Sequence, residues 1–325
     1  MKQRLFALIT ALCMAATALP AVFADGGESG ELTIGTSAQE QCSCVALCTE
    51  GNINPDCPVC SLDPSACEGT PLRPMLFGAP RAGVTYLDEN GVQQTATNAI
   101  QVAKSDAQWD GGWYVAQGDI TIGSQDTPQR VAVSGEVHLI LADGCTLTVN
   151  GGIEVGDGNS LTIYAQSTGS SMGTLIVQNV ADYNAGIGGG YNGTGGKITI
   201  NGGTVIATGG KYAGAGIGGG LSGDGGTFST GTDGNAVIFA SGRKANIEDK
   251  REQNSWQGII FEGTEGKVYG TNVTPTQDFT IPSDKTLTIE EGKTLTIQTD
   301  LTMQNEGTIQ NEGTIYNAVS YTHLR

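Results

Sequence analysis

The chain has 325 residues and a formal net charge of −17 at pH 7, from 16 Lys and Arg against 33 Asp and Glu. Its 50 glycines are about twice the usual share, but they lack the every-third-residue period of collagen, so a collagen is excluded. Hydrophobic residues make up 38% of the chain, which is enough to bury a core. The acidity disfavours nucleic-acid phosphates and anionic lipids, so we predict neither a nucleic-acid partner nor a membrane span in the mature chain.

Residues 1–24 have the order of a secretory signal peptide. A short basic start is followed by the apolar run Leu5–Ala21 and then by small residues before Asp25. A membrane anchor is the alternative, but the run is short and contains Pro20. We therefore expect cleavage after Ala24 and a secreted, extracellular protein.

Six cysteines are concentrated in residues 25–80, which we predict to be a Cys-rich, poorly structured segment. They are Cys42, Cys44, Cys48, Cys57, Cys60 and Cys67. In an exported protein, an even, dense set in a segment without a core is typical of a disulfide framework, and the count does not choose among the pairings. The Cys57–Cys60 spacing also fits a zinc knuckle, which is the alternative. Cys145 stands alone in a strand-like run and is expected to be a small buried hydrophobe.

The central part of the chain contains an internal repeat. After a predicted lead-in and N-terminal cap at 81–112, short alternating strands fill residues 113–242, and the hexapeptide Ala185–Gly190 returns thirty positions later as Ala215–Gly220. Short strands at close intervals fit a sandwich, a barrel or a solenoid, and the repeat favours the solenoid. We therefore predict an all-β fold in which successive rungs stack in parallel.

Alternation within these strands predicts which side chains point into the solenoid, because successive residues face opposite sides of a strand. The inward set comprises Val137, Leu139, Leu141, Leu147, Val149, Leu161, Ile163, Ile198, Ile200, Val205 and Ala207. His138 falls on the outward side of its strand, where we expect it to be solvated.

Two shorter repeats fill residues 272–318. Lys285–Ile289 recurs at Lys293–Ile297 with a period of eight, and Asn305–Ile309 recurs at Asn311–Ile315 with a period of six. These shortening periods predict a second, short-repeat solenoid with narrower rungs.

Between the two repeat zones, residues 243–271 read as an insertion or junction. It contains a predicted hairpin of Ile259–Glu262 and Lys267–Tyr269. The last residues, 319–325, resemble the adapter read-through found at the ends of metagenomic gene fragments. That resemblance implies a non-native tail and a longer parent protein, whose remaining part could be catalytic.

A polysaccharide lyase on such a scaffold would need clustered Asp residues to bind calcium and a basic residue to accept a proton. A glycoside hydrolase would need two carboxylates at a defined separation. Basic residues are scarce, because Arg130 is the only one between Lys104 and Lys197. Acidic residues stand mostly beside glycine, where turns place them for backbone hydrogen bonds. We therefore predict no catalytic residue, no metal site and no cofactor, while weak calcium binding at the loops of Asp224 and Asp233 stays open.

Three aromatic residues at the start of the solenoid are the candidate carbohydrate-binding residues: Trp109, Trp113 and Tyr114. Aromatic faces stack on pyranose rings, so a cluster of this kind indicates sugar binding. The alternative is a cap in which the large rings cover the open core of the first rung, as a terminal repeat requires.

Several of these segments together resemble the right-handed β-helix modules of surface proteins from Gram-positive gut bacteria. They are Val84–Gly91, Trp113–Val115, Val137–Leu147, Ser160–Tyr164 and the two hexapeptides. The Cys-rich leader is similar to one found before such modules, so the resemblance spans roughly residues 40 to 318.

This resemblance implies a right-handed parallel β-helix in a wall-associated protein. We predict a non-catalytic cell-surface module that acts in adhesion or as a stalk, with cell-wall or host glycans or surface proteins as partners. A carbohydrate-binding module and a polysaccharide lyase or glycoside hydrolase are the alternatives.

Overall fold

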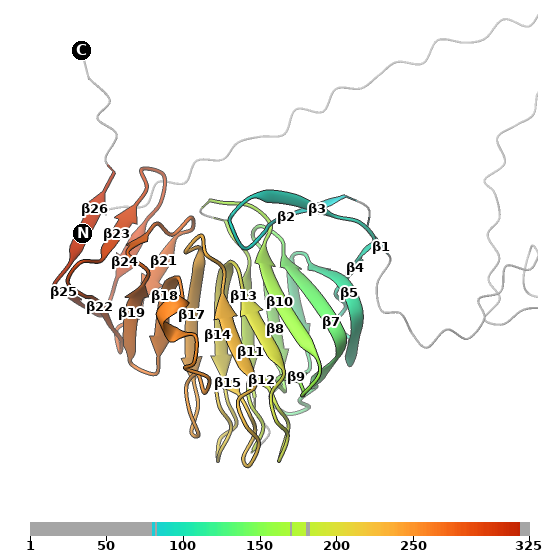
Figure 1. The fold of residues 1–325 in the computed structure, drawn as a ribbon. Helices are drawn as coiled ribbons and strands as arrows, with labels where there is room; N and C mark the ends of the chain where they lie inside the picture. The colour runs from blue at the N-terminus through green and yellow to red at the C-terminus, as the bar shows by residue number, and fades with distance from the viewer. Residues whose placement is uncertain (1–79, 82, 170, 180–182, 319–325) are drawn as a thin grey trace, which may run out of the picture. The chain divides into compact units, whose positions relative to one another are not determined.

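The computed structural model describes residues 80–81, 83–169, 171–179 and 183–318 (Figure 1). All of them belong to the compact unit Pro74–Arg325. Several predictions lie outside these residues: the signal peptide at 1–24, the cysteines Cys42, Cys44, Cys48, Cys57, Cys60 and Cys67, and the tail 319–325. The fold is nearly all β, as predicted, and the described helical structure is one 3-10 turn, η2 (Gln253–Ser255). No helix in the described part of the chain is long and apolar enough to cross a membrane.

One large sheet holds ten strands, and its pairs are parallel except where its first strand meets β4. The main path is β1 (Pro80–Arg81), β4 (Ala99–Gln101), β5 (Gln108–Ala116), β7 (Val131–Leu141), β10 (Ser160–Ala165), β13 (Lys197–Ile200) and β16 (Thr227–Thr230). Three short strands extend it: β9 (Ile153–Val155), β12 (Ile187–Gly188) and β15 (Ile217–Gly218).

The second large sheet holds nine strands. Its order is β25 (Thr308–Asn311), β22 (Thr286–Ile289), β19 (Glu265–Tyr269), β18 (Gly258–Glu262), β17 (Ala236–Ser241), β14 (Gly203–Thr208), β11 (Thr174–Gln178), β8 (Thr146–Asn150) and β6 (Asp119–Ile122). Three small sheets complete the fold: β2 (Val84–Leu87) with β3 (Gln93–Ala96), β20 (Asn272–Val273) with β23 (Thr294–Ile297) and β26 (Thr314–Asn317), and β21 (Phe279–Ile281) with β24 (Met303–Asn305).

The chain alternates between the two large sheets, so sequence neighbours such as β10 and β11 lie in different sheets. Most strands of the two large sheets pair in parallel with strands further along the chain, whereas β1 with β4 and β18 with β19 are antiparallel. Leu175 pairs with Val205 and Ile187 pairs with Ile217, thirty positions apart in both cases. The predicted thirty-residue stacking of the two hexapeptides is therefore confirmed.

The eleven side chains predicted to point inward are all fully buried, and they lie in one hydrophobic cluster between the sheets. Register aligns them in rows across the strands: Leu139 pairs with Ile163, and Ile163 pairs with Ile200. Full burial of a Leu or Ile side chain is worth about 1.5–3 kcal/mol. These rows are therefore the main source of stability in this half of the unit.

The predicted hairpin in the junction is present as β18 and β19, and it reverses the strand direction. Ile260 on β18 faces the first core, whereas its neighbours Ile259 and Phe261 face a second core built with Leu287 and Leu295. Successive residues of a strand face opposite sides. The second core therefore lies on the other face of the same sheet.

The two Lys-Thr-Leu-Thr-Ile copies do not pair with each other. They occupy different sheets, because Thr286 pairs with Thr308 and Thr294 pairs with Thr314. The eight-residue period therefore separates strands of two different sheets. Paired residues in this region lie 20 positions apart at Thr294 and 24 at Phe279, whose partner is Met303, which is shorter than the thirty positions of the central repeat.

Candidate functional site

Two of the three predicted sugar-binding aromatics lie inside the molecule. The ring of Trp109 is fully buried and its Nε1 donates a hydrogen bond to Asp106 at 2.9 Å. Tyr114 is 5% exposed, and its hydroxyl accepts a hydrogen bond from the backbone of Asp110. The two ring centroids are 5.7 Å apart, within the first core. Both rings therefore pack inside the first core, where no sugar ring can stack on them.

Trp113 lies on the outer face of the first sheet in an aromatic cluster with His138, Tyr164 and Tyr86. Its indole stacks on the imidazole of His138 with centroids 4.4 Å apart and also contacts Tyr86 at 4.5 Å. His138 Nδ1 lies 3.0 Å from the hydroxyl of Tyr164. Burial lowers the pKa of His138, against the opposing effect of Glu136, and burial raises the pKa of Tyr164 to about 12.

His138 faces outward, as predicted, but its side chain is only 21% exposed, so it is partly covered and not freely solvated. The β2–β3 hairpin brings Tyr86 over this face, where it contacts Trp113 and Tyr164, the two rings beside the imidazole. No local pattern in the sequence of β7 places that hairpin, so alternation alone could not anticipate the cover.

A second aromatic group lies on the surface. Tyr183, Tyr191 and Tyr212 are 41%, 58% and 55% exposed, and we call them the tyrosine patch. Tyr183 lies between the others, with ring centroids 5.4 Å from Tyr191 and 5.8 Å from Tyr212. The ammonium of Lys211 lies 5.3 Å from the centre of the Tyr212 ring. Three partly exposed tyrosine rings thus gather at one place on the surface.

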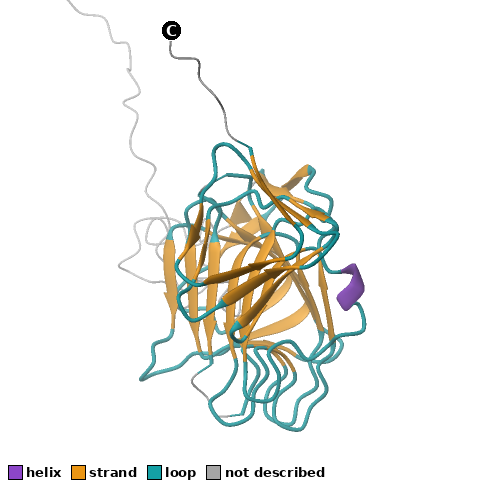
Figure 2. Cartoon of the chain, turned by 90° about the vertical axis from the view of Figure 1, so that its left-hand side faces the viewer, coloured by secondary structure: helices purple, strands orange, loops and turns teal. Residues whose placement is uncertain are grey.

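The tyrosine patch stands on glycine-rich loops that stack directly on one another, as the loops below the strands in Figure 2 show. Ile187 N–H donates to Gly216 O at 3.0 Å, and Gly189 N–H donates to Gly218 O at 2.8 Å. A Cβ at Gly188, where φ is +131°, would overlap the carbonyl oxygen of Gly218. Only glycine lets these backbones approach so closely, which explains the repeated hexapeptide and gives the tyrosines a firm base.

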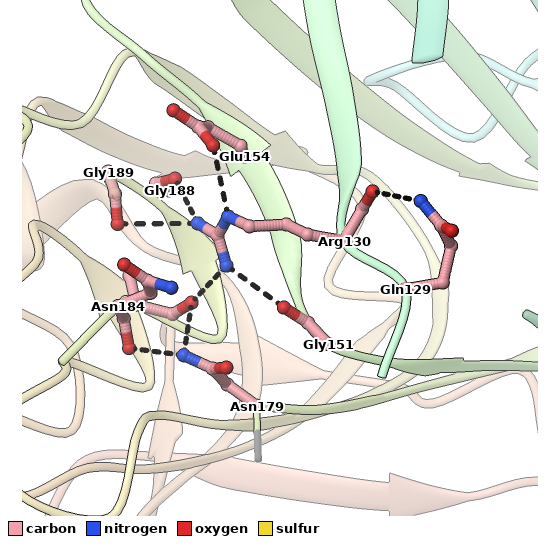
Figure 3. A network of polar contacts seen from close by, with 9 residues as sticks. Gln129, Arg130, Gly151, Glu154, Asn179, Asn184, Gly188 and Gly189 are labelled. Atoms are coloured by element: carbon pink, nitrogen blue, oxygen red, sulfur yellow. Dashed lines mark hydrogen bonds and ion pairs between the residues drawn. The ribbon is translucent and has the colours of Figure 1, made fainter. Parts of the chain in front are cut away.

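Arg130 holds the same loops from the side (Figure 3). Its guanidinium donates to Ala185 O at 3.0 Å and to Gly188 O at 2.9 Å, and it forms an ion pair with Glu154 at 3.2 Å. Burial lowers the pKa of Arg130, and Glu154 opposes that shift. The N–H groups of Arg130 thus bind carbonyl groups of the first hexapeptide, so the arginine supports the stacked glycine loops beneath the tyrosine patch.

A groove lies where the second core begins, between the outer face of the second large sheet and the strands β21 and β24. Its volume is about 830 Å³. Thr204, Ile206 and Thr208 of β14 and Phe239 of β17 form the floor, and Thr280 of β21 is on the opposite wall. We call it the threonine groove.

The acidic loops provide no metal cage in the described part of the chain, where no group of three or more His, Cys, Asp or Glu side chains is placed to hold an ion. Asp233 accepts a hydrogen bond from the backbone of Asn235 at 3.1 Å, and burial raises its pKa to about 6. Cys145 is buried and free, as predicted, and burial raises the pKa of its thiol to about 11. A thiol in that state is a packing group and not a nucleophile.

Comparisons of the chain with protein-family models, with curated proteins and with solved structures found no match. The assignment of a site therefore depends on the geometry. The sequence did hold a signal for the tyrosine patch: Tyr191 directly follows the first hexapeptide, and Tyr183 and Tyr212 stand two and three positions before the two copies. Tyrosines beside a loop repeat are brought together when the repeat stacks, which is how these three meet.

Proposed function

We propose that this chain is an extracellular right-handed parallel β-helix module that binds glycans at a cell surface without catalysing a reaction. The β-helix is supported by the parallel pairing one circuit apart and by the buried rows of Leu, Ile and Val. The right hand is supported by the strong preference for right-handed crossovers between parallel strands. The extracellular setting is supported by the signal-like residues 1–24 and by the resemblance to bacterial surface modules.

The tyrosine patch is the observation that carries the glycan-binding proposal. Tyrosine offers a flat apolar face together with a hydroxyl, which suits a sugar ring that has C–H bonds on its faces and hydroxyls at its edge. The ring centroids of Tyr191 and Tyr212 each lie within 6 Å of the Tyr183 ring, and the three residues remain 41–58% exposed. Exposed apolar patches of this kind mark interaction sites on soluble proteins.

The stacked glycine loops beneath the tyrosine patch favour binding, because they limit the conformational entropy that is lost when a ligand binds. Tyrosine has few rotatable bonds, and main-chain hydrogen bonds hold the loops that carry these residues, such as Leu221 N–H to Tyr183 O at 2.9 Å and Gly193 N–H to Gly190 O at 2.8 Å. Little conformational freedom is then lost when a ligand arrives. The acidic chain repels polyanions, so neutral glycans are the favoured ligands.

The test is glycan-array binding followed by titration calorimetry with the best neutral oligosaccharide. The double variant Tyr191→Ala/Tyr212→Ala should bind at least about tenfold more weakly, which corresponds to about 1.4 kcal/mol. Its thermal unfolding should match that of the wild type. Tyr316→Ala is the matched control, because Tyr316 is equally exposed (58%) but lies on β26, away from the glycine loops.

Three outcomes would contradict the proposal. Unchanged binding by the double variant would remove the tyrosine patch as the site. Loss of binding in Trp113→Ala together with full binding by the double variant would move the site to the aromatic cluster at Trp113. The absence of any glycan ligand for the wild-type chain would remove the glycan-binding function itself.

A further inference from the structure

The threonine groove has an open strand edge as one wall. Among the residues that the structure describes, β21 pairs only with β24, in parallel. Phe279 N–H donates to Thr302 O, and Ile281 O accepts from Glu306 N–H, so these two residues use their main-chain groups on the β24 side. Main-chain groups alternate sides along a strand, so the N–H and C=O of Thr280 point away from β24. Thr280 lines the groove.

The floor of the groove alternates apolar and hydroxyl-bearing rows. Ile206 pairs in register with Phe239, and Thr208 pairs with Ser241, so an apolar row and a hydroxyl row run side by side on the outer face of the second sheet. A strand lying on this floor would place alternate side chains toward it. Strand-in-groove recognition uses the same combination of main-chain pairing along an edge and side-chain pockets beside it.

We propose that the threonine groove binds an extended polypeptide segment of a partner protein, which adds to the free edge of β21. A peptide strand satisfies both main-chain groups of Thr280, because it carries a donor and an acceptor at matching spacing. The partner segment has an apolar side chain over Ile206 and Phe239. This site is separate from the tyrosine patch and goes beyond the proposed glycan binding.

Charge defines the partner further. Asp278 lines the groove and is exposed, although one carboxylate oxygen accepts a hydrogen bond from Thr302 N–H at 2.6 Å. Lys285 also lines the groove, but its side chain is only 18% exposed, donates to Gly263 O at 2.8 Å and lies 3.8 Å from Asp284. The groove thus presents a carboxylate more freely than a cation, within a chain of net charge −17. A segment that carries Lys or Arg beside its apolar residue is therefore preferred, because complementary charge speeds encounter and fixes register.

The experiment begins with a displayed library of random peptides, selected on the whole chain and counter-selected on Thr280→Pro. Proline removes the N–H at this position and is tolerated at a strand edge where that N–H makes no ladder bond. Thr280→Val is the matched control, because it changes the side chain and keeps the main chain. Binding of an enriched peptide is measured by fluorescence anisotropy, and a copy N-methylated at its central residue serves as a second control.

We expect peptides with an alternating pattern and a basic residue. Their affinity should fall at least tenfold for Thr280→Pro and for the N-methylated copy, and change less than twofold for Thr280→Val. Hydrogen exchange of the Thr280 amide should slow in the complex. The double variant Tyr191→Ala/Tyr212→Ala should bind these peptides normally, which keeps this test independent of the glycan-binding site.

Three results would overturn the proposal. The first is a selection that enriches nothing for the wild type over Thr280→Pro. The second is an enriched peptide whose binding leaves the exchange of the Thr280 amide unchanged. The third is protection of that amide by a neutral hexasaccharide that also displaces the peptide, which would make the groove a glycan site.

Discussion

The indole of Trp113 and the imidazole of His138 are register partners on neighbouring parallel strands, and their planes lie 17° apart. Tyr86 covers Trp113 from the β2–β3 hairpin, and Tyr164 completes the cluster beside His138. An outward position on a sheet has thereby become a partly buried one. This environment opposes protonation of the imidazole, because a charged ring loses hydration there.

Replacing His138 with Phe should reduce the loss of stability in weakly acidic solution. Burial lowers the pKa of His138 in the folded chain, despite the opposing effect of Glu136. The neutral ring therefore stabilises the fold fully above the ordinary value of about 6.5. This contribution is lost as the pH falls through the lower folded pKa, because the unfolded chain takes up the proton first.

The measurement is the midpoint of urea unfolding at several pH values across this window, for the wild type and His138→Phe. The difference between the two curves isolates residue 138, because every other titrating group is common to both. The same pH slope in both proteins would show that the imidazole titrates normally.

The local regularities of the sequence predicted the first core well. Alternation depends only on neighbouring residues, so it placed Leu139, Ile163 and Ile200 inward, where they are fully buried. The exact repeat of the hexapeptide likewise fixed the stacking of Ile187 on Ile217. Both inferences depend on regular periods in the sequence, which parallel pairing of the strands preserves.

The features that depend on distant contacts could not be predicted in this way. The second core lies on the opposite face of the sheet because the β18–β19 hairpin reverses the strand direction. The apolar pattern around Leu287 and Leu295 would be the same for either face, so the sequence could not indicate which face they cover. Trp109 and Trp113 looked alike in the sequence, yet one packs in the core and the other lies beneath a hairpin from β2 and β3.

Asp233→Asn should stabilise the protein at neutral pH. Burial raises the pKa of Asp233 to about 6, although hydrogen bonds from Asn235 oppose the shift, and Asp88 adds to it. The folded chain therefore holds the proton more tightly than the unfolded chain, and stability falls as the pH rises from about 4 to about 6. Removing the charge should recover on the order of 1–2 kcal/mol at pH 7.

Chemical denaturation at pH 7 and near pH 4 is the appropriate measurement, because the gain should shrink at the lower pH. Asp224→Asn is the control, since Asp224 is an exposed aspartate on a glycine-rich loop. An equal effect of the two substitutions would mean that general charge reduction, and not burial of Asp233, is responsible.

Gly188→Ala should be far more damaging than Gly144→Ala, although both glycines have a positive φ. At Gly144, φ is +70° and a Cβ would meet nothing within 4 Å, so only the backbone penalty of about 1–2 kcal/mol applies. At Gly188, φ is +131° and a Cβ would overlap the carbonyl oxygen of Gly218 in the stacked loop. We expect Gly188→Ala to lower the free energy of unfolding by at least about 3 kcal/mol.

Thermal unfolding of the two variants tests this difference. The glycan affinity of Gly188→Ala should also fall, because its loop lies beneath the tyrosine patch. Equal melting temperatures for the two variants would show that the loops are not as closely stacked as the structure has them.

Arg130→Met should lower the free energy of unfolding by about 2–4 kcal/mol, because it removes the guanidinium donors from the buried carbonyl groups of Ala185 and Gly188. Lysine at position 130 should not restore the stability, since one ammonium cannot reproduce the planar fork of donors that reaches both carbonyls and Glu154.

Glu154→Gln is the matched control: the Glu154 side chain is 46% exposed, and loss of the ion pair alone should cost less than about 1 kcal/mol. The measurement is the free energy of unfolding from urea titration, compared between the wild type and the Arg130 and Glu154 variants. If Arg130→Met costs no more than Glu154→Gln, then the bonds to the hexapeptide carbonyls add nothing, and the stacked glycine loops are held by their main-chain stacking alone.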